Sequence, residues 1–406
     1  MTEAITDDTG APRHPLQEIR VLDLGQIYNG SYCSFLLAQA GADVVKVEPP
    51  GGEPLRVRGG GKVDLAFAML NTNKRGIVLD LKTDEGRELL ERLAGEADVM
   101  LENFAPGALA RLGIDIESLM AHHPRLICAS GTGYGLSGPD RDNLAMDLTV
   151  QAVGGVMSIN GPDDGPPLKA GLAICDFLGA VHLYGGIVTA IAERAVTGRG
   201  RRVEVAMQEA LYPALASNLT SMHRRGGQPE RRGNRHPTRG SAPYNVYDCK
   251  DGHFAILCVK EAHWLSLLNV IDEHDAAADP RFATPALRAE HETEIDALFG
   301  PWFLERTRAQ IAAILKDARV PAAPVRNLAE VTADLHMHQR GMLKDVEHPV
   351  LGSVTLPGSP LRFYGTPELP LTLDPGLGEH TGEVLHEWLG LAEGEIEGFR
   401  AAGAVG

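Results

Sequence analysis

The sequence has few cysteines and a shortage of positive charge. Its five cysteines are scattered, odd in number and without C-x-x-C spacing, so they indicate neither a zinc site nor a disulfide framework, and we expect a cytoplasmic protein with reduced thiols. Lysine and arginine number 38 against 54 aspartates and glutamates, which gives a formal net charge of -16. Because this charge opposes binding to a polyanionic duplex, nucleic acid is not an expected partner.

Long apolar runs are also missing. The most apolar predicted helix, about residues 177–192, is followed by Glu193 and Arg194, and it is shorter than the roughly 20 residues that a bilayer-spanning helix needs. The first residues, MTEAITDDTGAPRHP, are polar and acidic and lack the basic start and apolar run of a signal peptide. We therefore expect no membrane association, and a disordered lead-in over residues 1–17.

Several short motifs of common enzyme classes are absent as well. The turn GQIYNG is not G-x-G-x-x-G, and GGGK at residues 59–62 lacks the Walker spacing, so NAD and P-loop sites gain little support. No G-x-S-x-G sequence is present, which argues against a serine hydrolase. His122-His123 and His336-x-His338 have no carboxylates at ligand spacing, so we predict no metal site.

What the sequence does contain is a regular alternation of short β-branched runs with helical segments. The runs cover about residues 19–24, 42–48, 75–81, 98–104 and 126–135. Such alternation is typical of βαβ units, and it predicts an α/β fold with a Rossmann-like parallel sheet. Beyond about residue 208 the pattern changes, since residues 224–240 resemble an exposed loop or linker and Asp251-Gly252 predicts a hairpin.

Basic residues gather between positions 46 and 82. Seven cations stand there against four acids, Glu48, Glu53, Asp64 and Asp80; the cations are Lys46, Arg56, Arg58, Lys62, Lys74, Arg75 and Lys82. Two interpretations stay open. The more common one is a solvated basic face, and the other is a site for a small, highly charged phosphate ligand.

One acidic residue interrupts the apolar stretch GLAICDFLGAVHLYGG, residues 171–186. Asp176 either starts a helix as its N-cap, a position that aspartate favours, or stands at the mouth of a cleft as a reactive carboxylate. Residue types alone leave both interpretations open.

Seven segments between residues 18 and 391 carry a family resemblance. They read VLDLGQIYNGSYCSFLLAQAGADVVKVEPPGG, NTNKRGIVLDLKTDEGRELL, ADVMLENFAPGALARLG, GPDRDNLAMDLTVQAVGG, DGPPLKAGLAICDFLGA, GNRHPTRGSAPY and LGEHTGEVLHEWLGL. In this order the chain resembles the class III CoA-transferases, the formyl-CoA transferase family, which also includes α-methylacyl-CoA racemases.

The resemblance implies an architecture and a mechanism. It implies a large Rossmann-like CoA-binding domain over residues 18–207 and 335–406, a smaller α+β middle domain over residues 208–334, and an interlocked homodimer. Asp176 matches the family's nucleophile, which would form an acyl anhydride and then a CoA thioester. Coenzyme A and its acyl thioesters would be substrates together with a carboxylic acid, with no permanently bound cofactor. We also expect amides at the helix start to keep Asp176 anionic.

Seven positions match the family's CoA contacts: Tyr28, Asn29, Leu79, Lys82, Asn103, Phe104 and Arg111. The resemblance implies that Lys82 and Arg111 meet phosphates, and that Tyr28, Leu79 and Phe104 flank the adenine. Tyr28-Asn29 and Pro49 depart from the formyl-CoA transferase pattern, and the family's glycine-rich insert is replaced by GNRHPTRGSAPY, which argues against formyl-CoA and oxalate. Arg235 and His236 in that replacement could meet the second carboxylate of a dicarboxylate such as succinate.

Two other functions remain as alternatives. An α-methylacyl-CoA racemase needs a His and an Asp as an acid–base pair, but Met146 stands at the histidine's position, and a thioether cannot take a proton. The other alternative is a non-catalytic CoA-binding protein.

Overall fold

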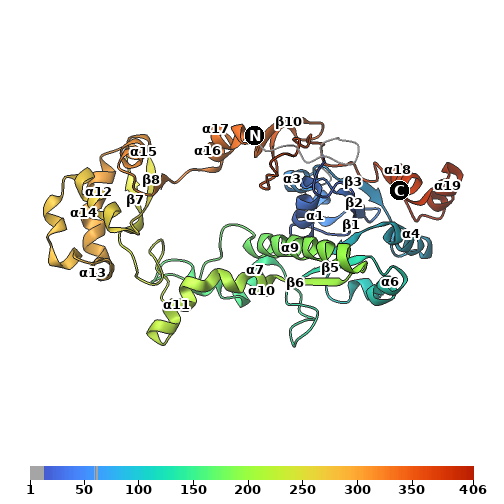
Figure 1. The fold of residues 1–406 in the computed structure, drawn as a ribbon, viewed down its shortest axis with the longest axis horizontal. Coiled ribbons are helices and arrows are strands. Elements are labelled where there is room, and N and C mark those ends of the chain that lie inside the picture. The colour runs from blue at the N-terminus through green and yellow to red at the C-terminus, as the bar shows by residue number, and fades with distance from the viewer. Residues whose placement is uncertain (1–12, 59, 61–62) are drawn as a thin grey trace. The chain divides into compact units, whose positions relative to one another are not determined.

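The chain forms two compact units in a computed structural model that describes residues 13–58, 60 and 63–406 (Figure 1). The larger unit holds the described residues up to 154 together with 171–213 and 334–406, and the smaller holds 155–170 and 214–333. A disordered lead-in was expected over residues 1–17. Residues 1–12 of this segment lie outside the described residues. Residues 13–17 are described, and Leu16 is buried there, with its N–H bonded to the Ala40 carbonyl at 3.0 Å.

The larger unit is built on a six-stranded sheet in the order β3-β2-β1-β4-β5-β6. All neighbouring strands are parallel, which confirms the predicted Rossmann-like α/β fold. The strands are β1 (Arg20–Asp23), β2 (Asp43–Glu48), β3 (Arg75–Val78), β4 (Val99–Glu102), β5 (Ile127–Thr132) and β6 (Arg202–Ala206).

Helices cover both faces of this sheet, because successive strand residues point to opposite sides. On one face Val21 and Val44 pack with α1 (Asn29–Gln39) and α9 (Ile174–Thr197). On the other, Leu22 and Val45 join a core with α4 (Asp84–Glu96), α6 (Ile116–His122) and the C-terminal α18 (Thr381–Leu389). The remaining helices and strands of this unit are α2 (Pro54–Val57), α3 (Leu65–Asn71), α5 (Ala108–Arg111), α7 (Asp147–Val153), α10 (Met207–Leu211), α17 (Leu335–Gln339), β10 (Leu343–His348), β11 (Gly352–Pro357) and α19 (Glu393–Ala401).

The strand order reverses between β1 and β4, whose carboxyl ends lie side by side. In open parallel sheets, ligands bind outside the carboxyl ends of the strands at such a reversal. The loops that leave β1 and β4 contain Tyr28, Asn103 and Phe104, and Asn29 begins α1 directly after the first of these loops. The topology therefore brings four of the residues matched to CoA contacts to one edge of the sheet.

Helix α9 is longer than predicted, since its 24 residues run from Ile174 to Thr197. By length and composition such a helix could cross a membrane, so the expectation that it is too short was wrong. It nevertheless packs against α1, β5 and β6. Arg194 near its end is buried and pairs with Asp98 at 2.8 Å, an arrangement typical of a helix in a folded α/β unit.

The smaller unit combines an antiparallel sheet with helices. Strands β7 (Tyr244–Cys249) and β8 (Gly252–Leu257) form the predicted hairpin, and β9 (Ala322–Pro324) adds to β8. The two-residue loop of this hairpin is Lys250-Asp251 and not Asp251-Gly252, because Cys249 pairs with Gly252, which already belongs to β8. A core around Phe254, Trp264 and Phe299 lies between this sheet and its helices. The helices are α8 (Val156–Ile159), α11 (Ala216–Arg225), α12 (Glu261–Ile271), α13 (Pro285–Glu290), α14 (Glu292–Leu304), α15 (Arg308–Asp317) and α16 (Leu328–Thr332).

Candidate active site

Asp176 is the third residue of α9 and does not cap it. The N-cap position is Ala173, which provides no side-chain cap. The capping acceptor instead comes from another helix, because the Asp147 carboxylate of α7 accepts a hydrogen bond from the Cys175 N–H at 2.8 Å. The N-cap interpretation of Asp176 is therefore wrong, and its carboxylate is available for another role.

The environment of Asp176 favours its neutral form. Burial, and secondarily the negative charge of Asp147, raise the pKa of Asp176 to about 7. Among the described residues, none donates a hydrogen bond to its carboxylate oxygens. The expectation that amides at the helix start keep it anionic was wrong, because Asp147 already occupies the Cys175 N–H.

Asn29 fixes the main chain at the same place. Its side-chain Nδ2 donates to the Asp176 carbonyl at 3.1 Å, and its amide lies between β5 and α9. A Cβ added at Gly131 would stand 2.2 Å from Asn29 Oδ1, and one at Gly179 would stand 2.4 Å from Nδ2. Glycine is therefore required at both positions for this close approach. Asn29 Oδ1 is buried, and no described residue donates a hydrogen bond to it.

Aromatic rings border the site next to Asp176. The ring of Phe177 stacks on Tyr28 with centroids 6.0 Å apart, and it meets the edge of Tyr32 at 4.8 Å. Arg58 donates to the Tyr28 hydroxyl at 3.1 Å and also bonds Asp64. The β1–α1 loop thus joins the first turn of α9 through a polar contact and a ring contact.

Asn103 ties the loops after β1 and β4 together. Its Oδ1 accepts from the Gln26 N–H at 2.7 Å, and its Nδ2 donates to the Gln26 carbonyl at 3.0 Å. Both polar atoms of this amide are therefore engaged by the protein. This arrangement differs from the direct CoA contact that the resemblance implies for the Asn103 side chain.

The other matched residues are in different environments. The Leu79 side chain is only 1% exposed and lies in the core between the sheet and α4, so it cannot flank an adenine as expected. Phe104 is half-buried against the same core. Lys82 and Arg111 are exposed after β3 and in α5, and Arg111 donates to the Pro106 carbonyl at 3.1 Å.

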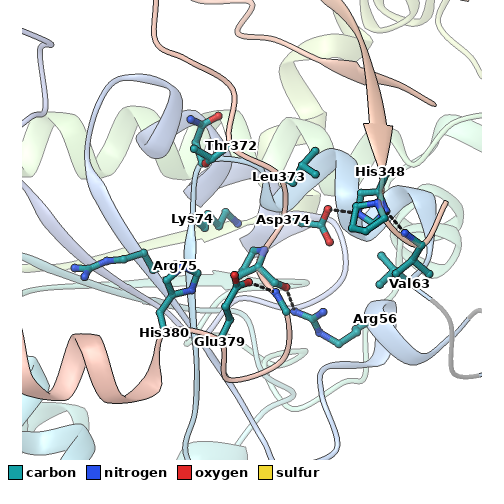
Figure 2. Close-up of a pocket in the computed structure, with 15 residues that line it drawn as sticks. Arg56, Val63, Lys74, Arg75, His348, Thr372, Leu373, Asp374, Glu379 and His380 are labelled. Carbon is teal, nitrogen blue, oxygen red and sulfur yellow. Dashed lines mark hydrogen bonds and ion pairs between the residues drawn. The ribbon is translucent and has the colours of Figure 1, made fainter. Parts of the chain in front are cut away.

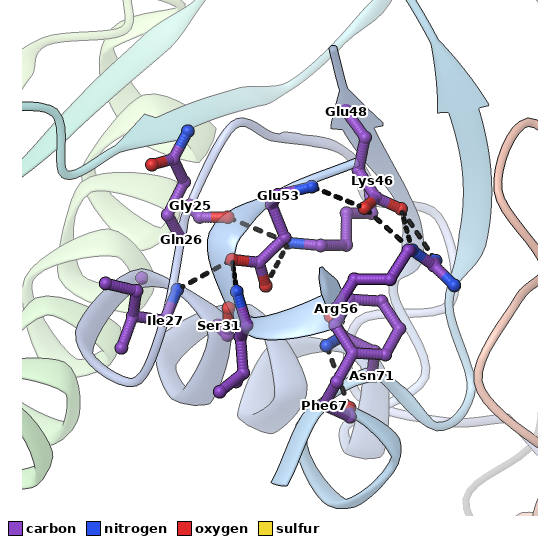
Figure 3. A network of polar contacts seen from close by, with 12 residues as sticks. Gly25, Gln26, Ile27, Ser31, Lys46, Glu48, Glu53, Arg56, Phe67 and Asn71 are labelled. Carbon is purple, nitrogen blue, oxygen red and sulfur yellow. Dashed lines mark hydrogen bonds and ion pairs between the residues drawn. The ribbon is translucent and has the colours of Figure 1, made fainter. Parts of the chain in front are cut away.

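Most of the clustered cations form internal ion pairs. Lys46, Lys74 and Arg56 are buried, and Figure 3 shows Lys46 beside Glu53 and Arg56 beside Glu48. Lys46 Nζ lies 3.7 Å from Glu53, Arg56 lies 2.7 Å from Glu48, and Lys74 lies 3.0 Å from Asp23. These three side chains therefore do not form a solvated basic face, because their charges are buried and paired within the unit; Arg56 and Lys74 also line the cavity described next. Lys62 lies outside the described residues.

A separate cavity of about 660 Å³ opens at the amino end of β3, and it is lined by Arg56, Val63 and residues 73–75, 348–350, 372–376, 379 and 380. Its charged groups already have partners, as Figure 2 shows for His348 and Asp374, which lie 2.9 Å apart. Asp176 is not among its lining residues. This cavity is therefore distinct from the site around Asp176.

Two residues of the site were missed by reasoning from the sequence. Asp147 caps α9 by accepting from the Cys175 N–H, which is 28 positions later in the chain. Nothing in the sequence around Asp147 indicates this contact. Glu53 was counted only as a charge, although its carboxylate accepts from the Ile27 N–H at 3.2 Å. Both act through contacts between distant segments. The part of the chain that the structure describes holds no cluster of three or more metal-ligating His, Cys, Asp or Glu residues.

Arg235 of the smaller unit was expected to meet a second carboxylate of the substrate, but its guanidinium has partners within the protein. Arg235 pairs with Asp296 at 2.5 Å and with Glu292 at 3.4 Å. His236 accepts from the Thr238 main chain, and burial lowers its pKa. The positive charge proposed to meet a second substrate carboxylate is therefore already balanced by two internal carboxylates.

The chain is similar to known proteins in sequence and in fold. The family described as CoA-transferase family III matches residues 16–381. The chain is 35% identical over 395 residues to the succinyl-CoA–D-citramalate CoA-transferase of Chloroflexus aurantiacus, covering 96% of this chain and 98% of that protein. It is also 35% identical over 409 residues to the formyl-CoA:oxalate CoA-transferase of Streptomyces avermitilis, covering 96% and 99%.

A solved structure agrees with these relatives. The CaiB/BaiF family protein from Brucella suis is 34% identical and superposes with a TM-score of 0.80, covering 92% of this chain and 99% of that one. The predicted resemblance is confirmed over nearly the whole chain, and the chain belongs to CoA-transferase family III.

Proposed function

We propose that this enzyme moves CoA from an acyl-CoA donor to a free carboxylic acid, and that Asp176 is the nucleophile. The observation that carries the proposal is the position of Asp176 in the first turn of α9. Its carboxylate is half-buried and has no donor to its oxygens among the described residues, while its main-chain carbonyl accepts a hydrogen bond from Asn29 of α1. A carboxylate in this state is poorly solvated, which favours attack on a carbonyl once it is ionised.

The reaction divides into steps that each conserve atoms and charge. The Asp176 carboxylate attacks the thioester carbonyl, the C–S bond breaks, and an acyl anhydride and CoA thiolate result. The thiolate attacks the aspartyl carbonyl, which releases the donor acid and leaves CoA as a thioester on Asp176. The acceptor carboxylate then opens this thioester to a second anhydride, and CoA thiolate takes the acceptor's acyl group. Asp176 is regenerated.

The remaining residues of the site bind and orient the substrates in this proposal. Lys82 and Arg111 are exposed cations suited to the phosphates of CoA. Tyr28 and Phe177 form an apolar wall beside Asp176. None of these steps needs a strong general base, in agreement with Met146, whose thioether stands where a racemase would need a proton-carrying histidine.

The acyl groups are a further part of the proposal. Relatives named for succinyl-CoA and citramalate and for formyl-CoA and oxalate are equally identical to this chain, so identity does not separate the two substrate pairs. The departures at Tyr28-Asn29 and Pro49 favour a donor other than formyl-CoA. We propose succinyl-CoA as donor, and as in the family resemblance we propose a cytoplasmic homodimer.

A donor-by-acceptor panel tests this function. Succinyl-CoA and formyl-CoA are each incubated with citramalate, succinate or oxalate, and the acyl-CoA products are identified by mass spectrometry. The proposal predicts new acyl-CoA species that require the acceptor acid. Deuterium uptake at the α-carbon of a 2-methylacyl-CoA without any acceptor would instead identify a racemase. CoA binding without turnover of any pair would identify a binding protein.

A further inference from the structure

The turn between β1 and α1 is held by side chains from the Gly25 N–H to the Ile27 N–H. Asp23 accepts from the Gly25 N–H at 2.8 Å, and Lys46 donates to the Gly25 carbonyl at 2.8 Å. Asn103 bonds both the N–H and the carbonyl of Gln26, and Glu53 accepts from the Ile27 N–H. Five consecutive polar groups of the main chain thus depend on four side chains, and Figure 3 shows two of these, Lys46 at Gly25 and Glu53 at Ile27.

Ile27 explains why so many contacts are present. Its φ is +58°, in the left-handed region where a β-branched side chain is sterically unfavourable. A residue keeps such a conformation only when its surroundings hold it there, and such residues gather at functional sites. Without its contacts, the turn would relax towards a conformation that isoleucine prefers.

Glu53 and Lys46 act on both sides of the strained residue. Glu53 is 1% exposed, and its Oε2 accepts from the N–H groups of Ile27 and Leu55. Lys46 is also fully buried, lies 3.7 Å from Glu53 Oε1 and bonds the carbonyl of Gly25. Glu48 in turn accepts from the Glu53 N–H at 3.0 Å. The pair is therefore fixed in place. Lys46 holds the turn at Gly25, before Ile27, and Glu53 holds it at Ile27 itself.

The residues that follow the turn are those that contact the first turn of α9. Tyr28 stacks on Phe177, and Asn29 bonds the Asp176 carbonyl. We propose that Glu53, paired with Lys46, is a positioning residue of the active site, which holds Ile27 left-handed so that Tyr28 and Asn29 orient Asp176. This inference rests on the proposed function of Asp176 as the nucleophile.

The test combines a loss with a specific rescue. Glu53→Gln keeps the shape of the side chain but weakens acceptance from Ile27 and leaves Lys46 without its partner charge. We expect kcat for CoA transfer to fall about tenfold to hundredfold, the scale of a slightly misplaced catalytic group, while KM for acyl-CoA changes less than about threefold. Adding Ile27→Gly removes the steric cost of the left-handed turn, so the double variant should recover at least about fivefold of the lost kcat.

A matched control separates positioning from the loss of any buried charge pair. Asp374 pairs with His348 at 2.9 Å, is buried to the same degree and does not contact the turn. Asp374→Asn should lower the melting temperature and leave kcat of the folded enzyme unchanged. An equal fall of kcat in Asp374→Asn, an unchanged kcat in Glu53→Gln, or no recovery on adding Ile27→Gly would each overturn the inference.

Amide hydrogen exchange provides a readout that does not depend on activity. Peptides covering residues 24–30 should exchange faster in Glu53→Gln than in the unmodified enzyme, and more slowly again in the double variant. If the unmodified enzyme transferred no CoA, the proposed function would fail, while this exchange pattern would still decide whether Glu53 holds the turn. Unchanged exchange in Glu53→Gln would refute that role.

Discussion

At the scale of single residues, two carboxylates share the start of α9 with different tasks. Asp147 accepts from the Cys175 N–H and from the Gln151 amide, whereas the Asp176 carboxylate has no such donor among the described residues. A carboxylate stabilised by donors is a poor nucleophile, and one without them is a better one once it is ionised. The contrast supports the proposal that Asp147 has a structural task and Asp176 the chemical one.

The pH dependence of the reaction follows from this pair. Because the pKa of Asp176 is raised to about 7 by burial and then by Asp147, and because the ionised form attacks, kcat/KM should rise with pH through about 7 and level off above it. Asp147→Asn keeps a capping oxygen but removes the like charge, so the pKa of Asp176 should fall and the rise should move to lower pH. Relative to its own value at pH 8, this variant should be more active at pH 6 than the unmodified enzyme. If the rise of kcat/KM in Asp147→Asn occurred at the same pH as in the unmodified enzyme, or at higher pH, this account would be contradicted.

The limits of sequence reasoning are also visible at this scale. Asp176 could be identified because its neighbours match a family motif. The helix start could not be located, since its cap comes from Asp147 on another helix. The burial of Lys46 and Lys74 could not be predicted, because each is neutralised by an acid from a separate segment, Glu53 and Asp23. Pairings between distant segments leave no periodic signal along the chain.

At the scale of elements, local patterns predicted the strands well. Each predicted β-branched run became a strand of the parallel sheet, whereas the edge strand β6 was not predicted. The predicted strands are buried almost continuously, as parallel strands covered by helices on both faces are, so each appears in the sequence as a short apolar, β-branched run. The length of α9 was underestimated, because the helix continues past the apolar run through Glu193 and Arg194 as far as Thr197, where Gly198 ends it in a left-handed conformation.

Two glycines of α9 test how the helix meets the β1–α1 loop. An added methyl at Gly179 would lie 2.4 Å from Asn29 Nδ2, whereas one at Gly185 would meet nothing within 4 Å. Gly179→Ala should therefore displace Asn29, lower the free energy of unfolding by about 1–3 kcal/mol and reduce kcat more than tenfold. Gly185→Ala should stabilise by up to about 1 kcal/mol without loss of activity. Chemical denaturation and steady-state kinetics measure both; equal effects of the two substitutions would contradict the proposed contact.

At the scale of the larger unit, a buried ionic network lies behind the site. Asp23 and Lys74 are both buried and 3.0 Å apart, and Lys74 also bonds Ser34 and Asn71. Burial lowers the pKa of Lys74 to about 8, although Asp23 opposes this shift. Such a pair costs desolvation when it forms, but the loss of one partner leaves the other charge uncompensated.

Lys74→Met should therefore lower the free energy of unfolding by about 3–5 kcal/mol. Lys344→Met, which breaks a solvent-exposed pair with Glu368 at 2.8 Å, should cost less than about 1 kcal/mol. Urea denaturation of both variants gives the comparison. If the two losses were similar, the buried network would not have the structural importance that its geometry indicates.

The most direct test of the account is the chemical fate of Asp176 during turnover. The enzyme is mixed with succinyl-CoA in the presence of hydroxylamine, digested, and analysed by peptide mass spectrometry, with Asp176→Asn as the control. The account predicts a hydroxamate on the peptide containing Asp176, formed only with the donor thioester and absent from the control. An unmodified Asp176 in an enzyme that still transfers CoA would contradict it.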